Sequence, residues 1–264
     1  MRAGLSQAGG LCYFEGARRE ERLYKIIMLP AFSVVIPCFN EAARIGETAR
    51  LTLNYLREVS PGSELIVVND GSTDATSTIA REALAMAEIE TRLLENSPNR
   101  GKGVAVRRGL LAAQKPMGLF FDADLSTPLE EIPKVIEPIT NDDVDVAFGS
   151  RALDRSLIGQ HQPWRREQAG RIFNLLVRVT TGLPFWDTQC GFKAFRLGVC
   201  RPILEAARIC GFAFDVELLY LAHRAGLRMR EIPVHWNHSE GSKVRFVHDS
   251  LRMLREVVAL RMHL

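Results

Sequence analysis

The sequence has no apolar run long enough to cross a membrane. A membrane-spanning helix needs about 18 or more consecutive apolar residues, whereas the longest uncharged run, from Ile26 to Asn40, is interrupted by Pro30 and Pro37. The region before it is rich in Gly, Ala and Arg and lacks the apolar centre of a signal peptide. We therefore expect residues 1–31 to form a flexible extension, with Met28 as the native start.

Two signatures of nucleotide-binding enzymes are also missing. No G-x-G-x-x-G follows the first strand-like run, where a dehydrogenase would carry it, and nothing matches the G-x-x-x-x-G-K-[ST] of a P-loop. The formal net charge is only +3, from 34 basic and 31 acidic residues, which argues against a nucleic-acid partner. Five cysteines show no metal-ligand spacing, and their odd number favours reduced thiols without a disulfide partner in a cytoplasmic protein.

The sequence does contain short apolar runs that alternate with amphipathic segments. With 47% hydrophobic residues among 264, the chain can bury a large core as one large domain, or as one domain with a C-terminal elaboration. The strand-like runs are Ser33–Ile36, Glu64–Val68, Leu93–Leu94 and Leu119–Phe121. Strands that alternate with helices predict an α/β fold, in which a mostly parallel sheet carries helices on both faces.

Polar side chains follow each of these four strands. They are Asn40 and Glu41, Asp70, Arg100 and Lys102, and Asp122 and Asp124. Because the carboxyl ends of parallel strands meet at one edge of the sheet, we expect these side chains to line one ligand site. Four polar strand ends at one edge suggest a site for a nucleotide diphosphate.

The pair Asp122 and Asp124 indicates a metal ion. On a strand both side chains would point the same way, and two carboxylates held together are costly unless they share a proton or a cation. A hard divalent ion, Mg²⁺ or Mn²⁺, gripped by the carboxylates and a diphosphate resolves this cost. A D-x-D alone is more often two solvated aspartates in a turn; the neighbouring polar strand ends favour the metal.

Several ordered motifs carry a family resemblance. SVVIPCFNE at Ser33, VVNDGSTD at Val67, NRGKG at Asn99 and the D-x-D together resemble the nucleotide-sugar half of inverting family 2 glycosyltransferases of the Rossmann-like GT-A fold. Four later motifs closely resemble dolichyl-phosphate β-glucosyltransferases and, more loosely, dolichyl-phosphate mannosyltransferases: GSR at Gly149, DTQCGFK at Asp187, FDVELL at Phe214 and EGSK at Glu240. The resemblance spans residues 32–264, with a glycosyltransferase domain over 32–240.

The resemblance implies transfer of glucose from UDP-glucose to a polyprenyl or dolichyl phosphate, with inversion at the anomeric carbon and help from Mg²⁺ or Mn²⁺. Nucleotide-sugar contacts are implied for Pro37, Asn40, Glu41, Asp70, Arg100, Lys102 and Asp122. Metal binding is implied for Asp122 and Asp124, with Asp124 counted as catalytic. Acceptor-phosphate binding is implied for Arg151, Arg165, Arg166 and Lys243.

Some roles stay open at this point. The resemblance makes Asp187 a catalytic base, but a lipid phosphate is already anionic, so orientation of the acceptor or the sugar is an equal alternative. Asp70 can equally cap a turn, and Lys102 can be a solvated residue at a helix start. The alternatives for the whole protein are another donor, such as GDP-mannose or a UDP-N-acetylhexosamine, a non-lipid acceptor, or a non-catalytic nucleotide-binding module.

The C-terminal residues 241–264 form a basic amphipathic pattern. From Lys243 to Leu264 the sequence has five Lys or Arg and two acidic residues. The apolar residues near one face are Leu251, Leu254, Val257, Val258 and Met262. Such a helix can lie on an anionic bilayer or dock on the domain. The aromatic residues Trp164, Phe185 and Trp186 are of the kind found at membrane interfaces. We expect peripheral attachment at the cytoplasmic face of a membrane.

Overall fold

The computed structural model describes residues 28–161, 163–239 and 246–263; the side chains of residues 165, 166, 246–251, 262 and 263 lie outside this description. Residues 1–27, most of the predicted extension, lie outside it too. Leu29, which the prediction also placed in the extension, is buried, and its N–H donates to the carbonyl oxygen of Val59 at 2.8 Å. The described chain is therefore packed against the domain before the first strand begins.

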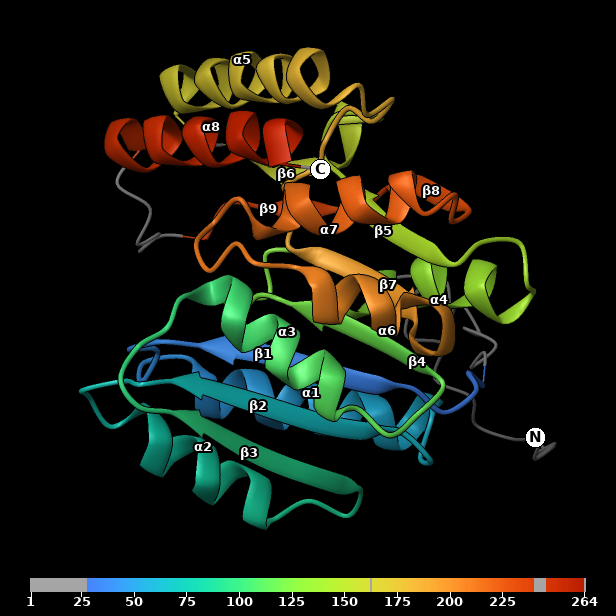
Figure 1. Ribbon diagram of the computed structural model, residues 1–264. Helices are drawn as coiled ribbons and strands as arrows, with labels where there is room; N and C mark the ends of the chain where they lie inside the picture. Colours follow the sequence, from blue (N-terminus) through green and yellow to red (C-terminus); the bar gives the residue numbers. More distant parts are fainter. Residues whose placement is uncertain (1–27, 162, 240–245, 264) are drawn as a thin grey trace, which may run out of the picture.

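A seven-stranded sheet forms the centre of the molecule (Figure 1). Its strands are β1 (Ser33–Cys38), β2 (Glu64–Asp70), β3 (Glu90–Asn96), β4 (Met117–Phe121), β5 (Val146–Ser150), β7 (Phe192–Arg196) and β8 (Met229–Pro233). They are ordered β3-β2-β1-β4-β7-β5-β8, and β7 runs antiparallel to both β4 and β5 while the other pairs are parallel. The sheet is mostly parallel, as predicted.

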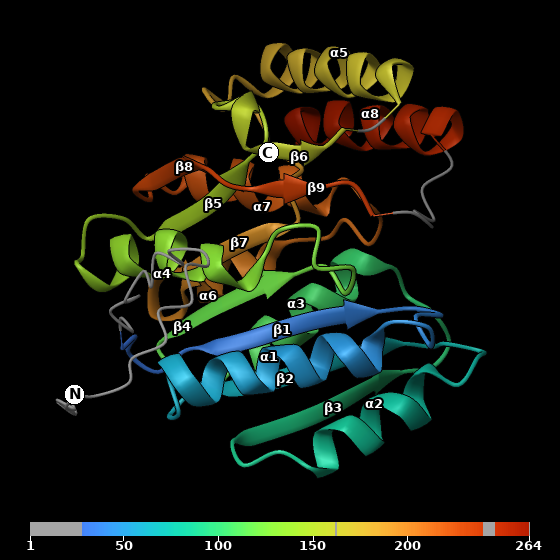
Figure 2. The same ribbon diagram turned by 180° about the vertical axis from the view of Figure 1, so that it is seen from behind.

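Helices cover both faces of the sheet (Figures 1 and 2). On one face lie α3 (Lys102–Ala112), α6 (Leu197–Ala206) and α7 (Phe214–Arg224). On the other lie α1 (Ile45–Val59), α2 (Thr76–Ala85) and α4 (Ile132–Thr140), the last preceded by the short helix η1 (Leu129–Glu131). Each face buries its own apolar cluster against these helices.

The sequence of β4 explains how one strand serves both clusters. Phe120 packs in the cluster under α3, α6 and α7, whereas its neighbour Phe121 packs in the cluster under α1 and α4. Successive side chains of a strand point to opposite faces, so a strand covered on both sides must be apolar throughout. This is why β1 and β4 are continuous apolar runs and not alternating ones.

A further layer lies beyond α7. Helices α5 (Trp164–Thr181) and α8 (Phe246–His263) lie side by side there, near a two-stranded sheet of β6 (Ile158–Gln160) and β9 (Trp236–Asn237) and the short helix η2 (Arg155–Leu157). Met253, Val257 and Leu260 of α8 are buried in the same cluster as residues of α5. Of the helices described, none is long and apolar enough to span a membrane.

The antiparallel strand β7 decides what gathers at the carboxyl edge of the sheet. The parallel strands all end at this edge, and β7 begins there because it runs the other way. The segment 187–191, which leads into β7, therefore lies at the same edge as Asp122 after β4 and Arg151 after β5. One strand of opposite direction thus brings the D-T-Q-C-G-F-K motif to the polar strand ends.

Candidate functional site

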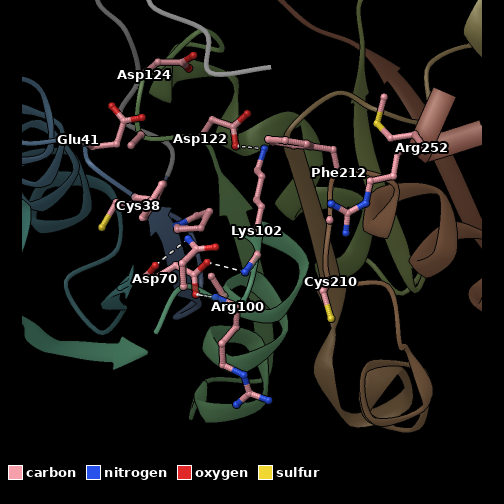
Figure 3. A pocket seen from close by; sticks show the side chains of 18 of the residues that line it. Cys38, Glu41, Asp70, Arg100, Lys102, Asp122, Asp124, Cys210, Phe212 and Arg252 are labelled. Carbon is pink, nitrogen blue, oxygen red and sulfur yellow. Dashed lines mark hydrogen bonds and ion pairs between the residues drawn. The ribbon is translucent and has the colours of Figure 1, made fainter. Parts of the chain in front are cut away.

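A cavity of about 620 Å³ opens at the edge of the sheet where β1, β2 and β4 end (Figure 3). Its lining includes seven of the predicted site residues: Pro37, Glu41, Asp70, Arg100, Lys102, Asp122 and Asp124. The structure thus brings together residues from four separate strand ends. Asn40 joins two loops beside the cavity: its Oδ1 accepts a hydrogen bond from the N–H of Thr73 at 2.8 Å.

Asp70, at the end of β2, holds the loop between β3 and α3. Its side chain is buried; Oδ1 accepts hydrogen bonds from Asn96 Nδ2 at 2.6 Å and the N–H of Arg100 at 3.0 Å, and Oδ2 accepts from the N–H of Gly101 at 2.7 Å. A carboxylate offers about four acceptor positions, so these three bonds leave one for a ligand. Asp70 was expected either to contact the nucleoside or to cap a turn. These hydrogen bonds show that it holds the turn before α3.

Two glycines let this loop meet a neighbouring segment closely. Gly101 has a φ of 99°, and a β-carbon on it would lie 2.9 Å from the carbonyl carbon of Cys210. The N–H of Gly103 donates to the carbonyl oxygen of the same cysteine at 2.8 Å. The N-R-G-K-G motif is therefore a close backbone contact, which fixes the main chain on both sides of Lys102.

Lys102 forms an ion pair with Asp122 across the middle of the cavity (Figure 3). The distance from Lys102 Nζ to Asp122 Oδ1 is 2.6 Å, and the side chains are 23% and 36% exposed. Burial lowers the pKa of Lys102, but the negative charges of Asp122 and Asp215 raise it more, so the net pKa lies above the usual value. The cavity therefore contains a positive charge between carboxylates.

A second ion pair, almost fully buried, lies behind Lys102. Lys193 Nζ is 2.7 Å from Asp215 Oδ1, and the ammonium also donates to the carbonyl oxygen of Cys190. Burial raises the pKa of Asp215 above its usual value, although Lys193 and Lys102 act in the opposite direction. Positive and negative groups thus alternate from the core to the cavity, in the order Lys193, Asp215, Lys102, Asp122.

The two aspartates of the D-x-D lie in a turn and not on the strand. β4 ends at Phe121, and the N–H of Leu125, a residue with a φ of 48°, donates to the carbonyl oxygen of Asp122 at 3.2 Å. The expectation that strand geometry aims both carboxylates the same way is wrong, because the chain turns as soon as it leaves the sheet. Both side chains nevertheless line the cavity, and Asp124 Oδ1 accepts from the N–H of Ser126 at 3.0 Å.

These carboxylates fit a divalent ion that is held jointly with a ligand. Mg²⁺ is typically bound by one or two protein carboxylates, with phosphate and water oxygens completing its shell. Asp122 and Asp124 supply such carboxylates, and in the described part of the chain no three or more His, Cys, Asp or Glu residues form a metal site by themselves. Gly191 leaves space beside Asp122, since a β-carbon there would lie 2.8 Å from Asp122 Cγ.

Asp187 lies outside the lining of this cavity and pairs with Arg151. The carboxylate accepts from the N–H of Arg151 at 3.0 Å, from its Nε at 2.7 Å and from its Nη2 at 2.8 Å. Burial raises the pKa of Asp187, but the charge and hydrogen bonds of Arg151 outweigh burial and leave the net pKa below its usual value. A buried, ionised carboxylate of lowered pKa is a weak base, so the geometry favours a positioning role over catalytic base.

Glu231 of β8 holds the main chain that carries Asp187. Its carboxylate accepts from the N–H of Asp187 at 2.7 Å, from the N–H of Trp186 at 2.9 Å and from the hydroxyl of Ser150 at 2.7 Å. The Arg151 guanidinium also lies over the ring of Trp236, 5.5 Å from its centroid. The guanidinium of Arg151 is thus held by the Asp187 carboxylate and by the ring of Trp236 at the carboxyl edge of the sheet.

The comparisons with known proteins agree with this architecture. The sequence profile described as glycosyl transferase family 2 matches residues 33–204. The chain belongs to this family. The dolichyl-phosphate β-glucosyltransferase of Saccharomyces cerevisiae is 35% identical over 254 residues, covering 87% of this chain and 74% of that protein. The Drosophila melanogaster enzyme of the same name is 37% identical over 238 residues, covering 85% of this chain and 72% of that protein.

A solved structure shares the fold of this family 2 glycosyltransferase. Glucosyl-3-phosphoglycerate synthase from Mycobacterium tuberculosis, crystallised with Mn²⁺, UDP and glucosyl-3-phosphoglycerate, superimposes with a TM-score of 0.64. It is 22% identical in sequence, and the match covers 88% of this chain and 79% of that one. The fold is GT-A, as predicted, and the predicted family is confirmed.

Of the four acceptor-phosphate residues predicted for the glycosyltransferase, only Arg151 can be placed by its side chain. Lys243 lies outside the described residues, as do the side chains of Arg165 and Arg166 in the first turn of α5. Arg151 is 28% exposed, so part of its guanidinium is reachable from solvent although Asp187 holds it.

The outer face of α5 is the most apolar exposed helix surface described. Trp164, Ile172, Leu175, Leu176 and Val179 are all exposed, and they share one face of the helix at 100° per residue. By contrast, among the side chains of α8 that the structure describes, Met253, Val257 and Leu260 are buried, while Val258 is exposed. Of the predicted apolar face, Val257 is buried and Leu254 packs against the core, whereas Val258 is exposed and the side chains of Leu251 and Met262 lie outside the description. The described part of the helix docks on the domain.

Sequence reasoning missed the wall of the glycosyltransferase cavity opposite β1. Cys210, Gly211 and Phe212 line it, as do Arg252, Met253 and Glu256 of α8 (Figure 3). Buried Glu217 of α7 anchors this wall: its two carboxylate oxygens accept from the N–H groups of Arg208 and Ile209, each at 2.7 Å. The contact between this wall and the loop of Gly101 and Gly103 had one signal in the sequence. The two glycines of N-R-G-K-G indicate that another backbone segment approaches closely.

Proposed function

We propose that this glycosyltransferase moves glucose from UDP-glucose to a polyprenyl or dolichyl phosphate, with inversion at the anomeric carbon and with Mg²⁺ or Mn²⁺ bound. The observation that carries the proposal is the grouping of Asp122, Asp124 and Lys102 on one cavity of about 620 Å³. That volume lies within the range of small-molecule sites. The names of the relatives support the acceptor and the sugar, and the Mn²⁺ and UDP of the structural neighbour support the donor and the metal.

The chemistry asks the cavity to stabilise a departing nucleoside diphosphate. Negative charge builds on the β-phosphate as the glycosidic bond breaks. Asp122 and Asp124 would hold a divalent ion there, and the ion would supply Lewis-acid stabilisation of that charge. Lys102 provides a further positive charge within the same cavity. Asp70 keeps the loop of Arg100 and Gly101 in place, and its remaining acceptor position suits a ribose hydroxyl or a base N–H.

The acceptor needs cations more than it needs a base. A phosphate monoester is anionic near neutral pH, so its oxygen can attack the anomeric carbon without first losing a proton. Arg151 offers the planar fork that suits phosphate oxygens. Asp187 and Glu231 hold that fork, while Arg165, Arg166 and Lys243 remain predicted acceptor contacts.

The outer face of α5 is our proposed membrane contact. The proposed acceptor is a lipid, so the enzyme has to meet a membrane surface to reach it. Arg171 and Arg178 lie along one side of the apolar face of α5, and Arg178 stacks on the exposed Trp186, with the guanidinium carbon 3.7 Å from the ring centroid. Apolar residues bordered by arginines complement the interface of an anionic bilayer. We propose peripheral attachment at the cytoplasmic face through this surface.

The decisive experiment is a transfer assay with a panel of radiolabelled nucleotide sugars and a short-chain polyprenyl phosphate. We expect label from UDP-glucose in the lipid, loss of transfer with EDTA and its return with Mg²⁺ or Mn²⁺. Label transferred only from GDP-mannose or a UDP-N-acetylhexosamine would replace the donor, and transfer only to a non-lipid acceptor would replace the acceptor. Full turnover by a folded Asp122→Ala/Asp124→Ala variant in excess EDTA would contradict the metal-dependent mechanism.

A further inference from the structure

The ion pair between Lys102 and Asp122 occupies one oxygen of a carboxylate that the proposed mechanism needs for its metal. Lys102 Nζ lies 2.6 Å from Asp122 Oδ1. This is close contact between an ammonium and one of the two oxygens that Asp122 can offer a cation. The ammonium therefore stands on the side of Asp122 that faces the cavity (Figure 3).

A divalent ion and this ammonium cannot share the carboxylate without strong repulsion. Like charges a few ångströms apart in a partly desolvated cavity repel far more than they do in bulk water. The metal therefore binds Asp122 more favourably once Lys102 has moved away. Since the backbone beside Lys102 is fixed by the bond from Gly103 to Cys210, the movement has to come from the side chain.

The side chain of Lys102 has a carboxylate to remain near after Asp122 is released. Asp215 lies behind Lys102 and attracts it, and Asp215 is itself held by the buried Lys193. A lysine has four rotatable bonds and a compact charge, so its ammonium can turn from one anion to another within reach. The anion that arrives with the donor is the diphosphate, which enters the same cavity.

We propose that Lys102 holds the place of the divalent ion at Asp122 until a nucleoside diphosphate draws the ammonium away, so that metal and donor bind cooperatively. This inference rests on the proposed function, because it takes the donor to be a nucleoside diphosphate sugar and Asp122 to be a metal ligand. It assigns Lys102 a role beyond contact with phosphate: the residue keeps the metal site closed in the absence of donor.

Direct metal-binding measurements test this assignment. Mn²⁺ is titrated into the full chain, and free Mn²⁺ is followed by electron paramagnetic resonance with and without saturating UDP. For the parent protein we expect weak Mn²⁺ binding alone and much tighter binding with UDP. For Lys102→Met we expect Mn²⁺ binding without UDP to tighten by at least about tenfold, which is 1.4 kcal/mol, and the gain on adding UDP to shrink.

Two control variants separate this effect from loss of positive charge in general. Lys115 is equally exposed and forms an ion pair with Glu90 at 2.9 Å, away from the cavity lining, so Lys115→Met should leave Mn²⁺ binding unchanged. Arg252 lines the same cavity but pairs with Glu256 at 3.1 Å, so Arg252→Met should have a much smaller effect than Lys102→Met. Thermal unfolding of each variant confirms that it is folded.

The outcomes distinguish this inference from the proposed function. If Lys102→Met binds Mn²⁺ no more tightly than the parent without UDP, or if Arg252→Met tightens binding equally, the placeholder role is wrong while metal-dependent transfer still stands. If the parent protein binds no Mn²⁺ even with UDP or UDP-glucose present, the metal site itself is wrong and both proposals fall. Tighter Mn²⁺ binding by Lys102→Met alone, lost again in Lys102→Met/Asp122→Asn, supports the inference.

Discussion

The carboxylate of Asp122 lies against the α-carbon of Gly191, in the space that a side chain would fill at that position. The two residues flank paired ends of β7 and β4, and a β-carbon on Gly191 would lie 2.8 Å from Asp122 Cγ. Real β-carbons do not approach other heavy atoms so closely. A glycine of the D-T-Q-C-G-F-K motif thus determines where the first carboxylate of the D-x-D can stand.

We predict that Gly191→Ala displaces Asp122 and impairs catalysis more than folding. A displacement of about 1 Å in a catalytic group can cost about a hundredfold in rate, so we expect kcat/KM to fall between tenfold and a hundredfold. Gly198→Ala in α6 is the matched control, because a β-carbon there meets nothing within 4 Å. Steady-state kinetics and Mn²⁺ titration of both variants measure the effect; full activity in Gly191→Ala would show that this contact is unimportant.

We predict that Asp187 acts through Arg151. Asp187→Asn removes a charge that three donors of Arg151 contact, so both kcat/KM for the acceptor and stability should fall. The stability loss should be about 1–3 kcal/mol, below the cost for fully buried pairs, because Arg151 is 28% exposed.

A double-mutant cycle separates this role from that of a base. If Asp187 positions Arg151, Arg151→Gln should lower activity as much as Asp187→Asn, and the double variant should lose little more. If Asp187 were a base, Asp187→Asn alone would cost orders of magnitude and would remove the acidic limb of the pH–rate profile.

The same pair predicts how stability depends on pH. Because the pKa of Asp187 is lowered in the folded protein, mainly by Arg151 against the effect of burial, the unfolded chain binds this proton more tightly. The stabilisation is therefore complete above the ordinary pKa of an aspartate, about 3.9, and is lost as the pH falls through the lower folded value. Unfolding temperatures of the parent and Asp187→Asn should converge on acidification below pH 4; a difference that persists or grows there would contradict the assignment.

The fold was predictable because its signals are local. Apolar runs such as Ser33–Ile36, followed by polar residues and helical patterns, specify parallel strands and place their ends at one edge. The grouping of Asp70, Lys102 and Asp122 on one cavity follows from that topology alone. The antiparallel direction of β7 could not be predicted in this way. The direction of a strand depends on which strands it pairs with, and its own sequence does not indicate this.

The site was less predictable where it depends on contacts between distant segments. Nothing near Asp187 indicates that Arg151 will occupy its carboxylate, because the two are brought together by β5 and β7. The apolar run Leu119–Phe121 did mark where β4 ends, but not the left-handed turn at Leu125 that sets the directions of the two aspartates. Tertiary partners and the geometry of turns are the properties that a local pattern leaves open.

We predict that the α5 face binds anionic vesicles. The triple variant Trp164→Ser/Ile172→Ser/Val179→Ser removes three apolar side chains that are each more than 60% exposed, so it should fold normally and lose vesicle binding by at least tenfold. Met86→Ser, at an 86% exposed apolar residue after α2, is the control and should bind as the parent does. Co-sedimentation with vesicles containing anionic lipid gives the measurement, and equal binding by parent and triple variant would place the membrane contact elsewhere.

We predict that Glu217→Gln weakens donor binding through the cavity wall. Both oxygens of Glu217 accept a backbone N–H, from Arg208 and from Ile209, whereas an amide has only one acceptor oxygen and would turn its NH₂ toward the other N–H. Leaving a buried donor unpaired costs about 1–3 kcal/mol. The wall that meets Gly103 should loosen, which raises KM for the donor more than it lowers kcat.

The control for this change is Glu205→Gln, whose carboxylate is largely exposed and lies 3.8 Å from Arg201. It should leave both constants and the unfolding temperature close to those of the parent. If Glu217→Gln lowers the unfolding temperature but leaves KM for the donor unchanged, the 208–212 segment is only a structural support. A rise in KM with a retained kcat would instead show that the buried carboxylate of α7 sets the shape of the donor cavity, because Arg208 and Ile209, which it holds, lead directly into the lining residues Cys210, Gly211 and Phe212.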